Sequence, residues 1–231
     1  STGQQASPKP RRKSKVDQVA DFETTTDPND CRVWAWGLAR IEYPDDVEMD
    51  NNIETFIERM QEESSVTYFH NLKFDAQFIL YWLLTNGYSY SNERTLKPME
   101  FRTLISDMGM FYSMTVKWEN GNTTDFRDSL KKLPMTIKRI AKAFNLEEGK
   151  GEIDYDTYRP VGHIITAEEE DYLRRDVSIL ANAMSEVINS GMTRLTVASD
   201  SMAEYKRLTT QNKFTRFFPV FGSYMDGEIR R

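Results

Sequence analysis

Residues 16–24 read Val-Asp-Gln-Val-Ala-Asp-Phe-Glu-Thr, and this stretch decides the fold that we expect. Its first seven residues predict a short strand that leads into an acidic turn. Residues 24–30 contain the sequence Pro-Asn-Asp, which favours a turn. Residues 31–41 are rich in Val and Trp and predict a second strand. Together these segments indicate a hairpin whose first strand ends in Asp21-Phe22-Glu23.

The rest of the chain alternates between helical and extended patterns. Apolar residues three or four apart predict helices, and Thr166-Ala-Glu-Glu is a capping box that should begin the longest of them. The further predicted elements are a helix at 52–63, a strand at 66–69, a helix from about 74 to Gly87, a hairpin at 108–128, a helix opened by Pro134 and running through Phe144, a helix at about 167–189 and a short helix at 199–211. We therefore expect an α/β fold with a central mixed β-sheet flanked by helices.

Composition restricts the class of protein. The chain has 231 residues, enough for one sizeable domain or one domain with an appendage. Its longest apolar run, residues 78–84, is too short to cross a bilayer, and the N-terminus has no stretch of signal-peptide type. We therefore predict a cytoplasmic protein without membrane contact. One cysteine and two histidines argue against a zinc site, so any metal would have oxygen ligands, which favours Mg²⁺ or Mn²⁺.

Charge is distributed unevenly along the chain. The net charge is −6, from 30 basic and 36 acidic residues. Residues 1–15 hold five basic residues and no acid, so the remainder carries −11. We interpret residues 1–15 as a disordered basic tail and assign it no function. The acidic remainder argues against a broad nucleic-acid-binding surface. It suits an enzyme that gathers carboxylates around metal ions and holds only a few nucleotides.

Two acidic motifs lie where predicted strands end. Asp21 and Glu23 are two residues apart on a strand, so both point to one face and repel each other unless a cation or solvent lies between them. Asp75 follows Asn71 by four residues at a strand-to-helix junction, which places both on one face of a helical turn. Each motif alone also has a simpler explanation. The first could be an exposed acidic turn, and the second a capping Asn with a first-turn Asp.

The third motif, Tyr172-Leu-Arg-Arg-Asp176, lies inside the predicted long helix, where a surface-exposed Asp is the simpler explanation. Taken in order, the patterns Asp-x-Glu, Asn-x-x-x-Asp and Tyr-x-x-x-Asp resemble the DEDD exonuclease superfamily, whose fold is RNase H-like. The tyrosine matches the tyrosine subclass of that superfamily. The histidine subclass would place His five residues before the last Asp, where this chain has Asp171.

Longer stretches make the resemblance more specific. They are similar to the protein-primed family B DNA polymerases of small Bacillus phages, and the similarity runs from about residue 17 to the C-terminus. These stretches are Asp21-Phe-Glu-Thr-Thr-Thr, Cys31-Arg-Val-Trp-Ala-Trp-Gly, Tyr68-Phe-His-Asn-Leu-Lys-Phe-Asp, Asp128-Ser-Leu-Lys-Lys-Leu-Pro, Ile140-Ala-Lys, Lys150-Gly-Glu-Ile-Asp-Tyr and Arg159-Pro-Val-Gly.

The resemblance implies a domain organisation. Residues 16–191 correspond to the proofreading exonuclease domain that begins these polymerases, and residues 192–231 to a truncated start of the polymerase palm. The paired catalytic aspartates of the palm do not occur in the chain, so the resemblance implies polymerase activity for a parent protein of viral DNA replication. Such a protein, encoded by a phage, would work in the cytoplasm of its bacterial host.

The resemblance also implies a site that hydrolyses single-stranded DNA at its 3′ end with two Mg²⁺ (or Mn²⁺) ions. The metal ligands would be Asp21, Glu23, Asp75 and Asp176. Tyr172, with an ordinary pKa near 10, is a poor base and is expected to orient the attacking water. Lys150 is expected to offset phosphate charge, unless it is a solvated loop lysine.

Further residues are implied to contact the substrate or a partner. The expected DNA contacts are Thr24, Tyr68, His70, Asn71, Phe74, Ser129, Leu130 and Tyr155. Stacking of bases on aromatic side chains tolerates any sequence, as proofreading requires, although Phe74 and Leu130 could instead belong to the core. His70 and Phe78 are expected to meet the terminal protein that primes replication.

Two alternatives remain open from the sequence. An RNA-trimming nuclease of the same superfamily would carry the same catalytic residues, since selectivity depends on contacts to the 2′-hydroxyl. The second alternative is a non-catalytic module that binds DNA ends or the terminal protein.

Overall fold

The computed structural model describes residues 15–146, 153–209 and 215–216 of the chain. These residues form β1 (Val16–Thr24), β2 (Val33–Arg40), β3 (Val47–Asp50), α1 (Ile53–Glu62), β4 (Ser65–Phe69), α2 (Leu72–Thr85), β5 (Ser89–Tyr90), β6 (Glu100–Ile105), β7 (Phe111–Lys117), β8 (Thr123–Asp128), the 3₁₀ turn η1 (Ser129–Lys131), α3 (Ile137–Ala143), α4 (Ala167–Asn189) and α5 (Val197–Thr209). The chain divides into two compact units, Ser1–Ser185 and Glu186–Arg231.

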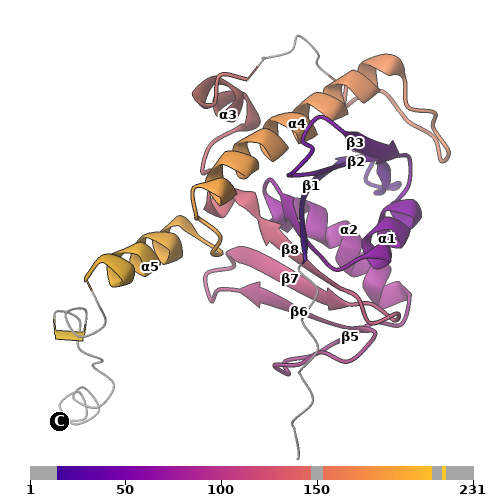
Figure 1. Cartoon of the computed structure of the whole chain (residues 1–231). Helices are drawn as coiled ribbons and strands as arrows, with labels where there is room; N and C mark the ends of the chain where they lie inside the picture. The colour runs from indigo at the N-terminus through magenta and orange to yellow at the C-terminus, as the bar shows by residue number, and fades with distance from the viewer. Residues whose placement is uncertain (1–14, 147–152, 210–214, 217–231) are drawn as a thin grey trace, which may run out of the picture. The chain divides into compact units, whose positions relative to one another are not determined.

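An eight-stranded mixed sheet organises the first unit (Figure 1). Its order is β3-β2-β1-β4-β8-β7-β6-β5. The central strands β1, β4 and β8 are parallel, whereas β2 and β3 on one side and β7 and β6 on the other pair antiparallel. The expected mixed α/β architecture is confirmed. The sequence patterns did not predict β3, β5 or β6.

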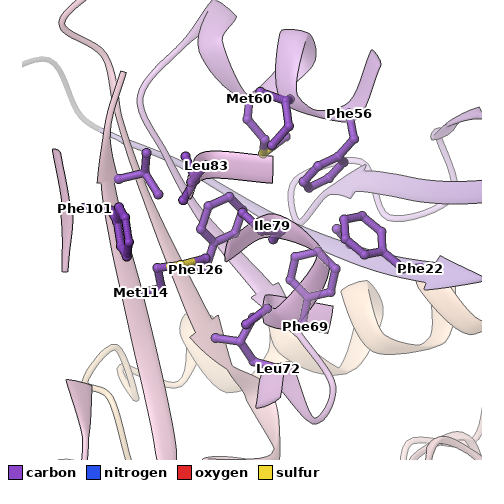
Figure 2. Packing of buried hydrophobic residues seen from close by; sticks show 14 of the residues in the cluster. Phe22, Phe56, Met60, Phe69, Leu72, Ile79, Leu83, Phe101, Met114 and Phe126 are labelled. Carbon is purple, nitrogen blue, oxygen red and sulfur yellow. The ribbon is translucent and has the colours of Figure 1, made fainter. Parts of the chain in front are cut away.

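The main core lies between the sheet and helices α1 and α2 (Figure 2). Phe22 of β1 belongs to this core, with ring centroids 4.7 Å from Phe56 of α1 and 5.0 Å from Phe69 of β4, both in edge-to-face geometry. Aromatic pairs of this kind contribute about 0.5–1.5 kcal/mol beyond the burial of their area. Ala20 and Phe22 point into this core. Because successive strand residues alternate in direction, Asp21 and Glu23 point to the opposite face of the sheet.

Helix α4 packs against that opposite face at Gly37 of β2. A Cβ atom at Gly37 would lie 2.9 Å from Cγ2 of Val177 and 3.0 Å from Cγ of Leu173, closer than side chains tolerate. Gly37 pairs directly with Asp21 across β1 and β2. The missing side chain therefore lets α4 approach the sheet next to Asp21.

Local capping explains where the helices begin. The capping box is confirmed: Oγ1 of Thr166 accepts from the amide of Glu169 at 3.3 Å, and Oε2 of Glu169 accepts from the amide of Thr166 at 3.0 Å. The expectation that Pro134 opens a helix is wrong, because α3 begins at Ile137 with Thr136 as its N-cap. The Thr136 side chain accepts a hydrogen bond from the amide of Arg139, which fixes the start of the helix beyond Pro134.

Lys15 differs from the prediction of a disordered tail. Its Nζ lies 3.0 Å from Oδ2 of Asp125 in β8. The other tail residues, 1–14, lie outside the described residues. The second unit contains α5, and within the described ranges no helix is long and apolar enough to cross a membrane.

Candidate active site at the end of the central strands

Asp21 and Glu23 lie in the part of β1 that extends beyond its parallel neighbour. The pairing of β1 with β4 runs from Val16 to Val19, whereas its pairing with β2 continues to Thr24. After β4 ends, the chain leaves the sheet beside Asp21 and enters α2. Glu23 is buried, with 4% of its surface exposed, and Asp21 is half-buried. The first acidic motif is therefore not an exposed turn.

Asp75 reaches the same place from the first turn of α2. Its side chain is 4% exposed, and the amide of Phe22 donates to it. Asn71 precedes the helix in a left-handed conformation (φ 72°), and its side chain makes no capping bond. Oδ1 of Asp128 instead accepts from the amides of Asn71 at 3.1 Å and Leu72 at 3.4 Å. The alternative in which the Asn71 side chain caps α2 is wrong, because an acid 57 residues away takes that role.

Tyr172 and Asp176 face the acids from α4. The Tyr172 hydroxyl donates to the Asp176 carboxylate and also shares a 3.3 Å hydrogen bond with the hydroxyl of Tyr155. Tyr155 comes from the loop before α4. Its main-chain oxygen accepts a hydrogen bond from Oγ1 of Thr26 at 3.0 Å. Two tyrosine hydroxyls and one carboxylate thus form a short polar chain at the edge of the acidic cluster.

The electrostatics show that the four acids act on one another. Burial, and then the charge of Asp176, raise the pKa of Asp21 from 3.8 to about 7. Burial and the charges of Asp21 and Asp176 raise the pKa of Glu23 from 4.5 to about 9. The pKa of Asp75 is raised by burial and by Asp21, and that of Asp176 by burial. Charging all four in this place is unfavourable without a compensating cation.

Tyr172 keeps its proton at any physiological pH. Burial, the hydrogen bond with Tyr155 and the charge of Asp176 raise the pKa of its hydroxyl far above the ordinary value near 10. A hydroxyl in this state can donate or accept a hydrogen bond but cannot serve as a base.

The donor set is chemically suited to hard divalent cations, which prefer carboxylate oxygens. Its side chains are not closed into a ready-made cage: among the described residues, no three His, Cys, Asp or Glu side chains are arranged to hold a metal ion. The fit therefore rests on the chemistry of four mutually repelling carboxyl groups rather than on a measured coordination geometry. Lys150, the predicted phosphate-facing lysine, lies outside the described residues.

The expected DNA contacts fall into two groups, those that reach solvent and those held by contacts within the protein. Phe74 is 48% exposed and Tyr155 is also 48% exposed, so both present rings to solvent. Asn71 is exposed, and Thr24 and Leu130 are half-buried.

The other three expected contacts are held inside the protein. Tyr68 is 2% exposed and hydrogen-bonded to Arg127. Ser129 is fully buried, and its Oγ donates to the carbonyl of Phe69 at 3.0 Å. Half-buried His70 is fixed between Oγ of Ser129 at 3.0 Å and the carbonyl of Met135 at 2.8 Å, and burial lowers its pKa.

A groove of about 820 Å³ runs beside the end of β1. Thr24, Phe74 and Phe78 line it, and the rings of Phe74 and Phe78 lie 5.8 Å apart. The groove therefore joins an expected DNA contact on β1 to the aromatic residues of α2. Its volume falls within the range of about 300–1,000 Å³ that is usual for ligand pockets.

Comparisons with known proteins show similarity to one polymerase family. Residues 57–165 match the family model for DNA polymerase type B, organellar and viral. The DNA polymerase of Bacillus phage M2 is 43% identical over 215 residues, which cover 91% of this chain and 37% of that protein. The chain is similar to the organellar and viral DNA polymerases of type B over the part of them that it spans. The predicted resemblance is confirmed, and the chain spans about 37% of the length of its curated relatives.

Solved structures of this polymerase family agree. Phi29 DNA polymerase in a ternary complex with primer-template DNA and incoming nucleotides matches with a TM-score of 0.86 and 38% identity, over 95% of this chain and 39% of that one. Phi29 DNA polymerase complexed with single-stranded DNA matches with a TM-score of 0.81 and 38% identity, over 87% of this chain and 36% of that one. The predicted fold class is confirmed by these matches. Polymerases of type B generally work with divalent metal ions.

Several residues of the site could not be found as motifs. Gly37 is significant only because α4 crosses it, and Asp128 only because it caps α2 from a distance. Arg159 and Glu169 were present in recognised stretches, the Arg-Pro-Val-Gly sequence and the capping box, but nothing in those stretches indicated that the two side chains meet.

Proposed function

We propose that this chain is a 3′→5′ exonuclease domain that removes nucleotides from single-stranded DNA ends. We further propose that it is the proofreading part of a protein-primed viral DNA polymerase. The supporting observation is the cluster of Asp21, Glu23, Asp75 and Asp176, brought from three separate segments to one edge of the sheet, where each raises the cost of charging another. A stable fold has no use for four repelling acids in one buried place, whereas a metal-dependent hydrolase does.

We propose that these residues bind two Mg²⁺ or Mn²⁺ ions, since the chemistry of their carboxylates suits hard cations. Asp21, Glu23 and Asp176 would hold one, and Asp21 and Asp75 the other. When bound, such ions lower the pKa of a water molecule and neutralise charge on the phosphate and the leaving oxygen. The carboxylates in turn need the cations, because raised pKa values show that their negative charges are poorly solvated.

Tyr172 would order the attacking water in this scheme. Its hydroxyl stays protonated, and the bonds to Asp176 and Tyr155 restrict where it can point. A hydroxyl fixed in this way reduces the orientational freedom of the reacting water without exchanging a proton with it.

The substrate strand would reach the acids along Thr24, Asn71, Phe74, Leu130 and Tyr155, the exposed or half-exposed members of the expected set. The buried Ser129 and Tyr68 and the half-buried His70 would act by bracing these residues. We retain Lys150 as a phosphate contact. His70 and Phe78 remain our proposed meeting point with a terminal protein.

The test is the cleavage of a 5′-labelled single-stranded DNA oligonucleotide by the purified chain. In Mg²⁺ or Mn²⁺ we expect products that shorten one nucleotide at a time from the 3′ end, and in EDTA none. Cleavage that persists in EDTA would exclude the metal mechanism. DNA binding without cleavage in either metal would make the chain a binding module. Faster cleavage of a matched RNA oligonucleotide would indicate RNA trimming instead.

A further inference from the structure

A buried ion pair joins the loop that carries Tyr155 to helix α4, which carries Tyr172. Nε of Arg159 donates to Oε1 of Glu169 at 2.6 Å, and both residues are buried. Glu169 stands near the start of α4, three residues before Tyr172 and seven before Asp176. On a helix these spacings place all three on one face. The ion pair and the catalytic face of α4 are therefore parts of one surface.

Arg159 holds the loop that carries Tyr155. Its Nη1 donates to the carbonyls of Asp154 and Thr157, at 2.9 Å each, so the two bonds span the turn that contains Tyr155. The guanidinium also lies over the ring of Trp34 in β2, 4.3 Å from its centroid. One side chain thus ties the loop to α4 and to the sheet.

The second carboxylate oxygen of Glu169 binds the part of the loop that follows Arg159. Oε2 accepts from Nε2 of His163 at 2.7 Å and from the amide of Thr166 at 3.0 Å. The ring of His163 packs edge-on against Trp34, with centroids 5.5 Å apart. The loop is therefore fixed on both sides of residue 160 by one carboxylate. Because a buried charge without its partner is costly, neither member of the pair can be removed without disturbing the loop.

We propose that Arg159 and Glu169 are positioning residues that hold the Tyr155 hydroxyl against Tyr172, and through it fix the geometry of the hydrolytic site. The proposal rests on the proposed exonuclease function. It depends on contacts only: the loop that carries Tyr155 has two tethers through Glu169, and the Tyr155 hydroxyl bonds to Tyr172 at 3.3 Å. The positive charge of Arg159 also lies close enough to Glu23 to favour its charged form.

A double-mutant cycle tests this proposal. Arg159→Lys keeps the charge but offers one nitrogen in place of the separate Nε and Nη1 that bond Glu169 and the two carbonyls. We expect its single-turnover rate on single-stranded DNA, with saturating protein and Mg²⁺, to fall about 10-fold, the lower end for residues that orient metal-site groups. Glu169→Gln should lower the single-turnover rate by a similar factor. Single-stranded DNA affinity in EDTA should stay within about twofold, because neither residue is among the expected DNA contacts.

The decisive comparison uses Tyr155→Phe. If the pair acts through the Tyr155 hydroxyl, adding Arg159→Lys to Tyr155→Phe should lower the rate by less than about twofold. If the double variant instead loses the product of the two single-variant factors, the proposal is overturned, because the two changes then act independently of each other. Glu170→Gln is the matched control, because Glu170 is adjacent on α4 and makes an exposed ion pair with Arg174 at 2.6 Å. Its rate should equal that of the unchanged protein.

Hydrogen exchange gives a readout that does not depend on activity. Arg159→Lys should speed amide exchange in residues 154–158 while leaving β1, β4 and β8 unchanged. Unchanged exchange in 154–158 would overturn the positioning role. If the unchanged chain shows no nuclease activity at all, the proposed function fails, and exchange still decides whether the pair holds the loop.

Discussion

Asp21→Asn should stabilise the metal-free protein at neutral and alkaline pH. The carboxyl of Asp21 has its pKa raised from 3.8 to about 7 by burial and by Asp176. An acid whose folded-state pKa lies above its unfolded value gives stability that is full at pH below about 4 and is lost as the pH rises through about 7. The asparagine carries no charge and avoids this loss.

The magnitude follows from the shift. Each pKa unit corresponds to about 1.36 kcal/mol, so the raised pKa of Asp21 costs roughly 4 kcal/mol of stability at pH 8, where the group is charged in both states, and roughly 1.5 kcal/mol at pH 5, where only the unfolded chain is charged. An asparagine amide in the same place must still be desolvated, which offsets about 1–3 kcal/mol. We expect a net gain of about 1–3 kcal/mol at pH 8 and little or none at pH 5.

Denaturant unfolding in EDTA, followed by tryptophan fluorescence at both pH values, measures this difference. Asp107→Asn is the control, since Asp107 is exposed and lies in the β6–β7 turn, away from the other acids. It should change stability at neither pH. If Asp21→Asn instead destabilises the metal-free protein at pH 8, or stabilises it equally at pH 5, then Asp21 is not under the repulsion that we describe.

The same geometry determines the expected outcome of three further experiments. Tyr172→Phe should lower the single-turnover rate about 10- to 100-fold, less than a base would, without weakening DNA binding; an unchanged rate would make Tyr172 a bystander. Gly37→Ala should cost about 1–3 kcal/mol of stability by overpacking, and by displacing Asp176 it should slow cleavage by up to about 100-fold; full activity would mean that the close approach of α4 is irrelevant. The concentration of Mn²⁺ that half-saturates the protein should fall as pH rises from 6 to 9, because metal binding must displace protons from Asp21 (pKa about 7) and Glu23 (pKa about 9); calorimetry that finds a constant value would contradict the assignment.

The sequence was most informative where chemistry follows from local spacing. Asp21 and Glu23 share a face because a strand has a period of two, and Tyr172 and Asp176 do so because a helix brings residues four apart together. The long helix α4 was predicted with its observed bounds because the Thr166–Glu169 capping box defines its start. These relations need no knowledge of the rest of the chain.

Features that depend on distant segments could not be predicted in this way. Asp128 caps α2 across 57 residues, and Arg159 meets Glu169 only because the intervening loop folds back over Trp34. The short strands β3 and β5 have two to four residues, and Val47 is their one buried side chain, so they carry no clear alternation. Pro134 misled the assignment of α3, since a proline near a helix start does not identify which residue caps it.

The central claim is that the acidic cluster performs metal-dependent hydrolysis at DNA 3′ ends. The most direct measurement compares Asp176→Ala with Asp171→Ala, an exposed acid five residues earlier on the same helix, in single-turnover cleavage of 5′-labelled single-stranded DNA in Mg²⁺. We predict that Asp176→Ala loses more than about 100-fold in rate, as expected when one charge-stabilising group is removed, and that Asp171→Ala cleaves like the unchanged protein. Equal rates for the two variants would contradict the claim.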